Sequence, residues 1–211
     1  MDIPTDNQTL HREIYLMLAS LFRQAPNEAV IDFLATLDIE AEQSNMQKAW
    51  LTLKHAASNT SQQALEDEYQ SLFIGIGRGE VVPFASWHLT GSLMEKPLAE
   101  IRHDLVQLGF EREADVKEPE DHIAALCEVM ALMTDDHDAT LQQAFFNKHL
   151  SPWTHKLTGQ MKEAQSADFY RAVAELADAF FNLDAVRFSE NIASSRNKSK
   201  IDVKNVTDSL Q

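Results

Sequence analysis

Apolar residues recur at helical spacing along almost the whole chain. In the first run, Leu10, Ile14, Met17 and Phe22 fall on one face of a helix that Pro26 would end. The 211 residues include only 6 glycines and 6 prolines, so few positions oppose helix formation. The sequence therefore predicts an all-α protein, a helical bundle of about nine to ten helices.

One stretch, residues 74–87, departs from this pattern. It holds three glycines, one proline and two aromatic residues, which together oppose a helix. A long loop with apolar content either packs against the body of the protein or exposes a binding surface, and we favour a functional loop. The spacing Gly75-x-Gly77-x-Gly79 is a weak nucleotide-binding motif, because no strand precedes it and no Gly-Lys-Ser/Thr follows.

The segment Glu118-Pro119-Glu120-Asp121-His122-Ile123 places three carboxylates, a proline and an imidazole between two helix-rich halves. Proline at a first helical position loses no backbone hydrogen bond, so we expect a helix to begin here. The apolar stripe of that helix would start at His122 and place this side chain at the buried edge. The carboxylates either cap the helix, since its dipole favours negative charge there, or form part of a site. The pattern leaves both open.

This segment divides the chain into four predicted parts. They are an N-terminal helical half (1–109), a charged connector or hinge (110–117), a C-terminal helical half (118–188) and a flexible tail (189–211) rich in Ser, Asn and Lys. A connector between two helical halves permits domain swapping. We therefore expect a monomer in equilibrium with a domain-swapped homodimer.

The charge of the chain restricts its partners. With 33 acidic against 18 basic residues, the formal net charge is −15, which argues against a nucleic-acid partner and suits a basic one. The N-terminus has no basic, apolar signal segment, and no stretch is long and apolar enough to span a membrane. We expect a cytoplasmic protein with no membrane insertion.

The sequence contains no convincing catalytic or metal site. Cys127 is the only cysteine and can form neither an internal disulfide nor a thiolate metal site. The pair Glu100-x-x-His103 has di-iron spacing, but such a site needs two pairs. Residues 135–138 lack the glycine and distal glutamate of a calcium loop. We expect no enzyme activity and no metal; a metal-dependent enzyme using Asp121 and His122 is the alternative.

An ordered set of motifs covers roughly residues 10–185. It consists of Tyr69-x-x-Leu72-Phe73, the loop Pro83-x-Ala85-Ser86, the segment Glu118-Pro119-x-Asp121-His122, then Ser151-Pro152-Trp153 and Phe169-Tyr170. This set resembles the TorD/DmsD family of dedicated cytoplasmic chaperones for molybdoenzymes, and its loop is most similar to the branch that serves trimethylamine N-oxide reductase.

The resemblance implies an all-helical chaperone that binds the twin-arginine signal peptide and the apo form of a molybdopterin reductase. Such a chaperone assists molybdenum cofactor insertion and prevents premature export. Trimethylamine N-oxide reductase is the first expected client, and a dimethyl sulfoxide reductase or another molybdoenzyme is the alternative. We expect no bound cofactor, with a guanine nucleotide left open.

A twin-arginine peptide joins a basic segment to an apolar one, so its receptor should place carboxylates beside an apolar groove. The predicted signal-peptide and client-binding residues are Leu72, Pro83, Phe84, Ser86, Trp87, Glu118, Pro119, Asp121 and His122. Asp121 would either meet the peptide or orient His122, and His122 would report pH, orient Asp121 or be a buried histidine bonded to a carboxylate.

Overall fold

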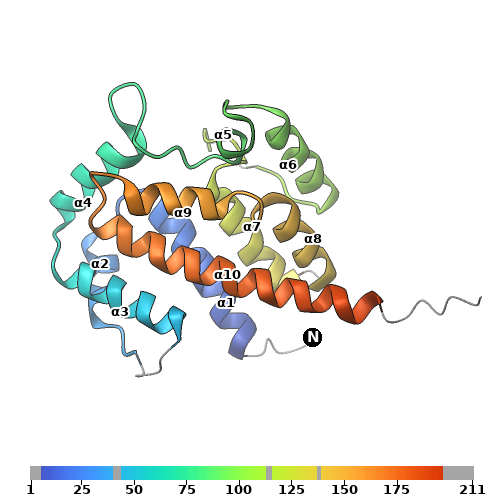
Figure 1. Ribbon diagram of the computed structural model, residues 1–211, viewed down its shortest axis with the longest axis horizontal. Coiled ribbons are helices and arrows are strands. Elements are labelled where there is room, and N and C mark those ends of the chain that lie inside the picture. Colours follow the sequence, from blue (N-terminus) through green and yellow to red (C-terminus); the bar gives the residue numbers. More distant parts are fainter. Residues whose placement is uncertain (1–5, 40–43, 113–115, 137–138, 197–211) are drawn as a thin grey trace, which may run out of the picture.

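The computed structural model describes residues 6–39, 44–112, 116–136 and 139–196. Within these ranges the chain forms ten α-helices, one π-helical turn and no strand, which confirms the predicted all-α fold (Figure 1). The elements are α1 (Asp6–Arg23), α2 (Glu28–Thr36), α3 (Asn45–Ser58), α4 (Gln62–Tyr69), η1 (Gln70–Ile74), α5 (Ala85–Thr90), α6 (Lys96–Gln107), α7 (Ile123–Asp136), α8 (Ala139–His149), α9 (Thr154–Glu163) and α10 (Phe169–Arg196). None of the helices in these ranges combines the length and apolarity that crossing a membrane requires.

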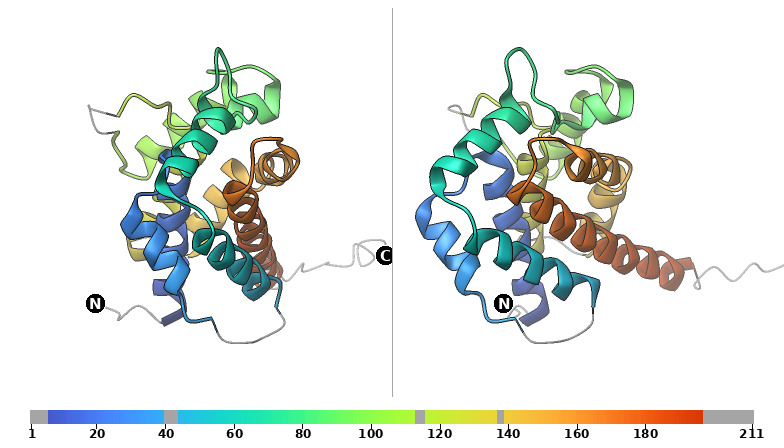
Figure 2. Two further views of the ribbon diagram at one scale, coloured as in Figure 1. Left: turned by 90° about the vertical axis from the view of Figure 1, so that its left-hand side faces the viewer. Right: turned by 60° about the vertical axis from the view of Figure 1, so that its left-hand side comes forward.

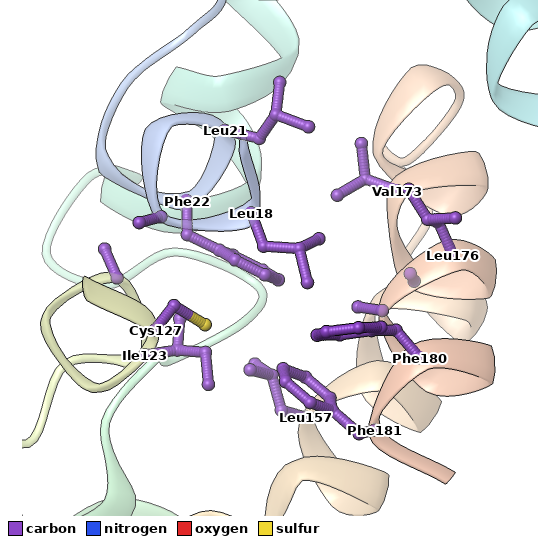
Figure 3. Packing of buried hydrophobic residues seen from close by; sticks show 14 of the residues in the cluster. Leu18, Leu21, Phe22, Ile123, Cys127, Leu157, Val173, Leu176, Phe180 and Phe181 are labelled. Atoms are coloured by element: carbon purple, nitrogen blue, oxygen red, sulfur yellow. The ribbon is translucent and has the colours of Figure 1, made fainter. Parts of the chain in front are cut away.

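The hydrophobic core lies between α1 and α7 on one side and α9 and α10 on the other (Figure 3). Phe22 of α1, Cys127 of α7 and Phe180 of α10 are all fully buried there. Helix α1 packs along α7, and α10 packs against both α3 and α9. The predicted N-terminal and C-terminal halves therefore share one cluster of buried side chains. Burial also raises the pKa of the Cys127 thiol, as expected of a small core residue.

Several helix ends follow from local sequence signals. Asn27 caps α2 by accepting a hydrogen bond from the Val30 amide at 3.0 Å. Pro97 lies in the first turn of α6, and Gly109 follows that helix with a φ of 81°, as predicted for both residues. These ends depend only on residues within one turn, so sequence patterns can locate them.

Three predicted boundaries differ from the structure. Helix α7 begins at Ile123 rather than at Pro119, because the Asp121 carbonyl and the Ile123 amide are hydrogen-bonded to a distant loop. The predicted loop 74–87 ends in a short helix, α5, from residue 85 onward. Helix α10 continues to Arg196, so the predicted tail begins too early, and residues 197–211 lie outside the described residues.

Parts of two other predicted features also lie outside the described residues. These are residues 113–115 of the connector and residues 137–138 of the segment 135–138, which was considered above as a calcium loop. Domain swapping across the connector stays a prediction.

Candidate functional site

A projecting loop between α4 and α5 is the most exposed apolar feature near the predicted site. We call residues 74–79 the finger; it stands out from the helical body at the top of Figure 1 and in both views of Figure 2. Helix α4 runs directly into η1, whose π-helical turn ends where the Gly75 amide donates to the Gln70 carbonyl at 2.7 Å. The chain returns where the Val81 amide donates to the Leu72 carbonyl at 2.8 Å. Isolated π-turns of this kind are frequent at functional sites.

The finger closes so tightly that two of its glycines have no room for a side chain. A Cβ on Gly75 would lie 2.2 Å from the Arg78 carbonyl oxygen, and Gly75 has a φ of 61°. A Cβ on Gly79 would lie 2.5 Å from the Leu72 carbonyl oxygen. The glycines thus serve the loop's own backbone packing. The Gly75 amide is already bonded within the chain, in keeping with the weakness of the glycine spacing as a phosphate-binding motif.

Two carboxylates, one on each side of the finger, fix its base to the start of α10. Glu68 of α4 accepts hydrogen bonds from the backbone amides of Asp168, Phe169 and Tyr170 at 2.7–3.1 Å. Glu80 accepts from the Gln165 amide at 2.7 Å and from the Ser166 amide and hydroxyl. Both carboxylates bind free amides at or just before a helix N-terminus, where negative charge is stabilised. The finger therefore rises from a rigid base.

The finger exposes apolar side chains. Ile76 is fully exposed and Ile74 is about half exposed. Arg78 folds back so that its guanidinium carbon lies 4.7 Å from the ring centroid of Trp87 in α5. This cation–π contact links the finger to α5.

A second exposed apolar group follows α5. Leu93 and Met94 lie in the turn between α5 and α6, and Met94 is 74 % exposed with a φ of 59°, an uncommon value for a non-glycine residue. Leu89 at the end of α5 is also exposed. The sequence predictions missed these side chains and Ile76. The sequence does contain a signal for them: Ile76, Leu93 and Met94 are apolar residues close to glycines, outside any predicted helix whose apolar face could be buried.

The loop after the finger is joined to the Glu118–Ile123 segment by an antiparallel bridge between Phe84 and His122. The Ile123 amide donates to the Pro83 carbonyl, and the Ala85 amide donates to the Asp121 carbonyl, both at 2.9 Å. These long-range bonds explain why α7 starts only at Ile123.

Asp121 acts within this bridge. Its buried carboxylate accepts a hydrogen bond from the Ser86 amide at 2.9 Å, which satisfies a donor in the first turn of α5. No hydrogen bond between Asp121 and the His122 ring occurs in the described part of the chain. The structure therefore shows a third role for Asp121 besides the two predicted ones: it caps the first turn of α5, which carries Trp87 and follows Phe84.

His122 is buried and neutral. Its Nδ1 accepts a hydrogen bond from the Ala124 amide at 3.1 Å, and its ring packs edge-on against Phe84 with centroids 4.9 Å apart. Burial, reinforced by the positive charge of Arg23, lowers the pKa of His122 to about 4. A neutral ring with Nδ1 as acceptor carries its proton on Nε2.

The remaining carboxylates of the segment differ in their partners. Glu120 pairs with Arg102 at 2.8 Å and lies 3.8 Å from Arg112. Arg23 at the end of α1 forms a bidentate pair with Glu128 of α7. Glu118 is half-buried; burial raises its pKa, the charge of Arg23 opposes the rise and that of Glu128 adds to it. No ion pair within 4.0 Å is found for Glu118 among the described residues.

The structure brings the predicted residues of segments 72–87 and 118–122 together, and these residues differ in their exposure to solvent. Leu72, Pro83, Ser86, Asp121 and His122 are buried, and Phe84, Trp87, Glu118 and Pro119 are half-buried. The fully buried members support the surface from below. Ile74 and Ile76 on the finger, Leu89 in α5, and Leu93 and Met94 in the α5–α6 turn are among the exposed apolar side chains of the described residues. Client binding by the predicted residues stays a prediction.

No group of three or more His, Cys, Asp and Glu side chains arranged to hold a metal ion occurs in the described ranges. Asp121 is occupied by the Ser86 amide, and His122 accepts from its own helix, so these two residues have structural partners.

Comparison with known proteins identifies the family. Residues 39–159 match the family model described as nitrate reductase delta subunit. The same chain is similar along most of its length to proteins named TorD and DmsD. The chain belongs to the TorD/DmsD family.

The relatives of this TorD/DmsD protein are chaperones. The chaperone TorD of Aliivibrio fischeri is 28% identical over 82% of this chain and 91% of its own length. TorD of Vibrio parahaemolyticus is 24% identical, with 82% and 92% covered. DmsD of Haemophilus influenzae, assigned as a Tat proofreading chaperone, is 26% identical, with 82% and 93% covered. This TorD/DmsD protein is accordingly a chaperone and not an enzyme.

A solved structure supports the fold of this TorD/DmsD protein. The crystal structure of a protein from Archaeoglobus fulgidus, assigned to redox enzyme maturation, superimposes with a TM-score of 0.54 and 19% sequence identity. The match covers 82% of this chain and 92% of that one. The two chains share an arrangement of helices.

Proposed function

We propose that this protein is a dedicated cytoplasmic chaperone that binds the twin-arginine signal peptide and apo form of a molybdopterin reductase. It would keep the precursor competent for molybdenum cofactor insertion and hold it back from export. Trimethylamine N-oxide reductase is the first proposed client, because the relatives include several TorD chaperones. A dimethyl sulfoxide reductase is the alternative, because DmsD is about equally similar.

The observation that carries this proposal is the exposed apolar surface on a rigid base. A signal peptide contains an apolar segment next to a basic one. Along the chain, Ile76 on the finger precedes Phe84 and Trp87, and Met94 in the α5–α6 turn follows them. Both Ile76 and Met94 are exposed, while hydrogen bonds to Glu68, Glu80 and Asp121 fix the segments between them. A preorganised apolar surface loses little conformational entropy when it receives the apolar segment.

The basic segment of the peptide requires carboxylates. Glu118 is half-buried; partial burial raises its pKa, the charge of Arg23 opposes the rise and that of Glu128 adds to it. An incoming arginine would give Glu118 a direct partner through charge-assisted hydrogen bonds. The net charge of −15 would also steer a basic peptide toward the chaperone.

Titration calorimetry with a synthetic twin-arginine signal peptide of trimethylamine N-oxide reductase tests the apolar part. Ile76→Ser should weaken binding by roughly 10–100-fold, because an isoleucine buried in an interface contributes about 1.5–3 kcal/mol. Leu132→Ser is the matched control, since Leu132 is an exposed side chain on α7 outside this surface. Unchanged affinity in the Ile76 variant would remove the finger from the binding surface.

The charged part is tested by Glu118→Gln, which keeps the shape and removes the charge. Binding should weaken, and the affinity of the variant should depend less on salt than that of the unmodified protein. Equal salt dependence in the two proteins would show that Glu118 does not bind the arginines.

A parallel titration with the dimethyl sulfoxide reductase signal peptide separates the two candidate clients. Tighter binding of that peptide would overturn the first choice of client and leave the chaperone class intact.

We propose no bound cofactor, and calorimetric heat on addition of GTP would contradict this. We also propose a monomer in equilibrium with a domain-swapped dimer; size-exclusion chromatography showing only monomer after concentration and refolding would contradict it.

A further inference from the structure

A second apolar surface lies away from the finger, where α1, α2 and α3 meet at the lower left of Figure 1. A groove of about 590 Å³ runs between these helices. Its walls are mainly apolar: Leu10 and Met17 from α1, Val30 and Phe33 from α2, and Trp50 from α3. None of the residues assigned to the proposed signal-peptide surface lines this groove.

The edges of the groove expose large apolar side chains. Phe33 is 58 % exposed and Leu10 is 56 % exposed, while Met17, Val30 and Trp50 are half-buried in the floor and walls. Scattered exposed apolar residues are ordinary, but a contiguous concave group of them is typical of a binding groove. Methionine and aromatic side chains at such a surface adapt to the shape of a partner.

The lengths of the two apolar rows define the occupant's shape. Leu10 and Met17 are seven residues apart on α1, and Val30, Phe33 and Leu37 span seven residues on α2 and its C-cap. Seven helical residues cover roughly 10 Å, about two turns. The groove therefore matches two turns of a helix that presents apolar side chains at i, i+3 or i+4, and i+7.

The walls of the groove also favour a helical occupant over an extended one. Helices α1, α2 and α3 form the walls, and their backbone groups are bonded within each helix. An extended segment would find no sheet edge with which to pair, so its own backbone groups would lose their hydrogen bonds on burial. A helix satisfies its backbone internally.

Charge at the groove defines the occupant's chemistry. Glu13 and Asp38 are the charged residues in its lining, and both are acidic. Glu13 already pairs with Arg12 at 2.7 Å, whereas Asp38 is exposed just beyond the C-terminal end of α2, where the helix dipole is also negative. Lys54 Nζ donates a hydrogen bond to the Leu37 carbonyl at 2.7 Å. A second copy of this acidic chain would bring like charge to the groove, so a basic partner fits better.

We propose that the α1–α2–α3 groove binds an amphipathic helix of a partner polypeptide, whose apolar face enters the groove and whose basic flank meets Asp38. The inference does not depend on the proposed signal-peptide function, because the finger and this groove share no residue. A chaperone with both surfaces holds two segments of polypeptide at once.

The test uses the full chain and three synthetic peptides of about 14 residues, roughly four turns. The first carries leucines at helical i, i+3, i+4 and i+7 positions with lysines on the flanks. The second replaces the lysines by glutamates, and the third keeps the first composition in shuffled order. Calorimetry should show binding of the first peptide, at least tenfold weaker binding of the second and the weakest binding of the third. Equal binding of the first and shuffled peptides would overturn the proposal.

Variants locate the binding on the chaperone. Phe33→Ser should weaken binding of the lysine peptide at least tenfold, and Asp38→Asn should weaken it at low salt and much less at high salt. Leu51→Ser is the control, because Leu51 is 46 % exposed on α3 but does not line the groove. Ile76→Ser should leave this binding unchanged. Both Phe33 and Leu51 are exposed, so the circular dichroism of both variants should match that of the unmodified protein.

Two outcomes would overturn the assignment. A loss in Leu51→Ser equal to that in Phe33→Ser would show that the peptide binds outside the groove. A dimer in sedimentation that Phe33→Ser abolishes in the absence of peptide would show that the groove binds a second copy of the chain instead.

Discussion

Asp121 offers the sharpest test of how the Glu118–Ile123 segment works. Its carboxylate is buried and accepts a hydrogen bond from the Ser86 amide at 2.9 Å. In Asp121→Ala this amide loses its acceptor while the surrounding bridge still buries it. In Asp121→Asn an oxygen acceptor remains, although its charge is lost.

The size of the effect follows from that one bond. A hydrogen bond to a charged group contributes about 1.5–3 kcal/mol, and a buried donor left unpaired costs a similar amount. We therefore expect Asp121→Ala to lower the free energy of unfolding by about 2–3 kcal/mol and Asp121→Asn by about 1 kcal/mol. For a chain of this size, the Ala variant should lower the Tm by roughly 4–12 °C.

Thermal unfolding followed by circular dichroism measures the loss, and amide hydrogen exchange locates it. The Ser86 amide should exchange faster in Asp121→Ala. The Ala85 amide is an internal reference, because it donates to the backbone carbonyl of Asp121, which the substitution keeps. Asp32→Ala is the control variant, since Asp32 is an exposed aspartate on α2.

A Tm for Asp121→Ala within about 1 °C of that for Asp32→Ala would refute the capping role, since it corresponds to well under 1 kcal/mol. Peptide binding then distinguishes a structural role of Asp121 from direct contact between Asp121 and the peptide. If Asp121 only holds the loop, Asp121→Asn should retain most of its affinity for the signal peptide. If it pairs with an arginine, the same variant should lose about as much affinity as Glu118→Gln.

Two further predictions concern His122 and the finger. The pKa of His122 is about 4 in the folded protein against 6.5 when unperturbed, so the unfolded chain binds the proton first as the pH falls. The contribution of His122 to the free energy of unfolding is complete above about pH 6.5 and falls by about 3 kcal/mol between pH 6.5 and 4. Urea unfolding at several pH values measures this fall. Over the same pH range, His122→Gln should lose about 3 kcal/mol less than the unmodified protein. In the finger, Gly79→Ala should cost more than 2 kcal/mol because its Cβ would overlap the backbone at Leu72, whereas Gly77→Ala, with open space around it, should cost about 1 kcal/mol from its φ of 89°. Equal urea midpoints for the two glycine variants would contradict this packing.

Local patterns predicted most of the helices. The stripe through Leu10, Ile14 and Phe22 appears as α1, and Pro97 and Gly109 mark the two ends of α6. These predictions hold because a helix depends on residues three and four positions apart and on caps within one turn.

The start of α7 shows where local patterns fail. Pro119 is a good first helical residue, yet the helix begins at Ile123. The Ile123 amide is bonded to the Pro83 carbonyl, 40 residues earlier in the chain, and the Asp121 carboxylate is bonded to Ser86. No pattern within the segment reveals those partners, so the sequence could not show that Asp121 caps α5 and not the helix that follows it.

By itself, the sequence determined that this chain is helical, acidic and free of a recognisable catalytic motif, since these properties depend on composition and short-range spacing. Only the tertiary structure decided which residues of the predicted site meet solvent. It buried Asp121 and His122 in a bridge between distant segments and left Ile76 and Met94 exposed. Exposure depends on what the rest of the chain packs against each side chain, and contacts between residues tens of positions apart set that packing.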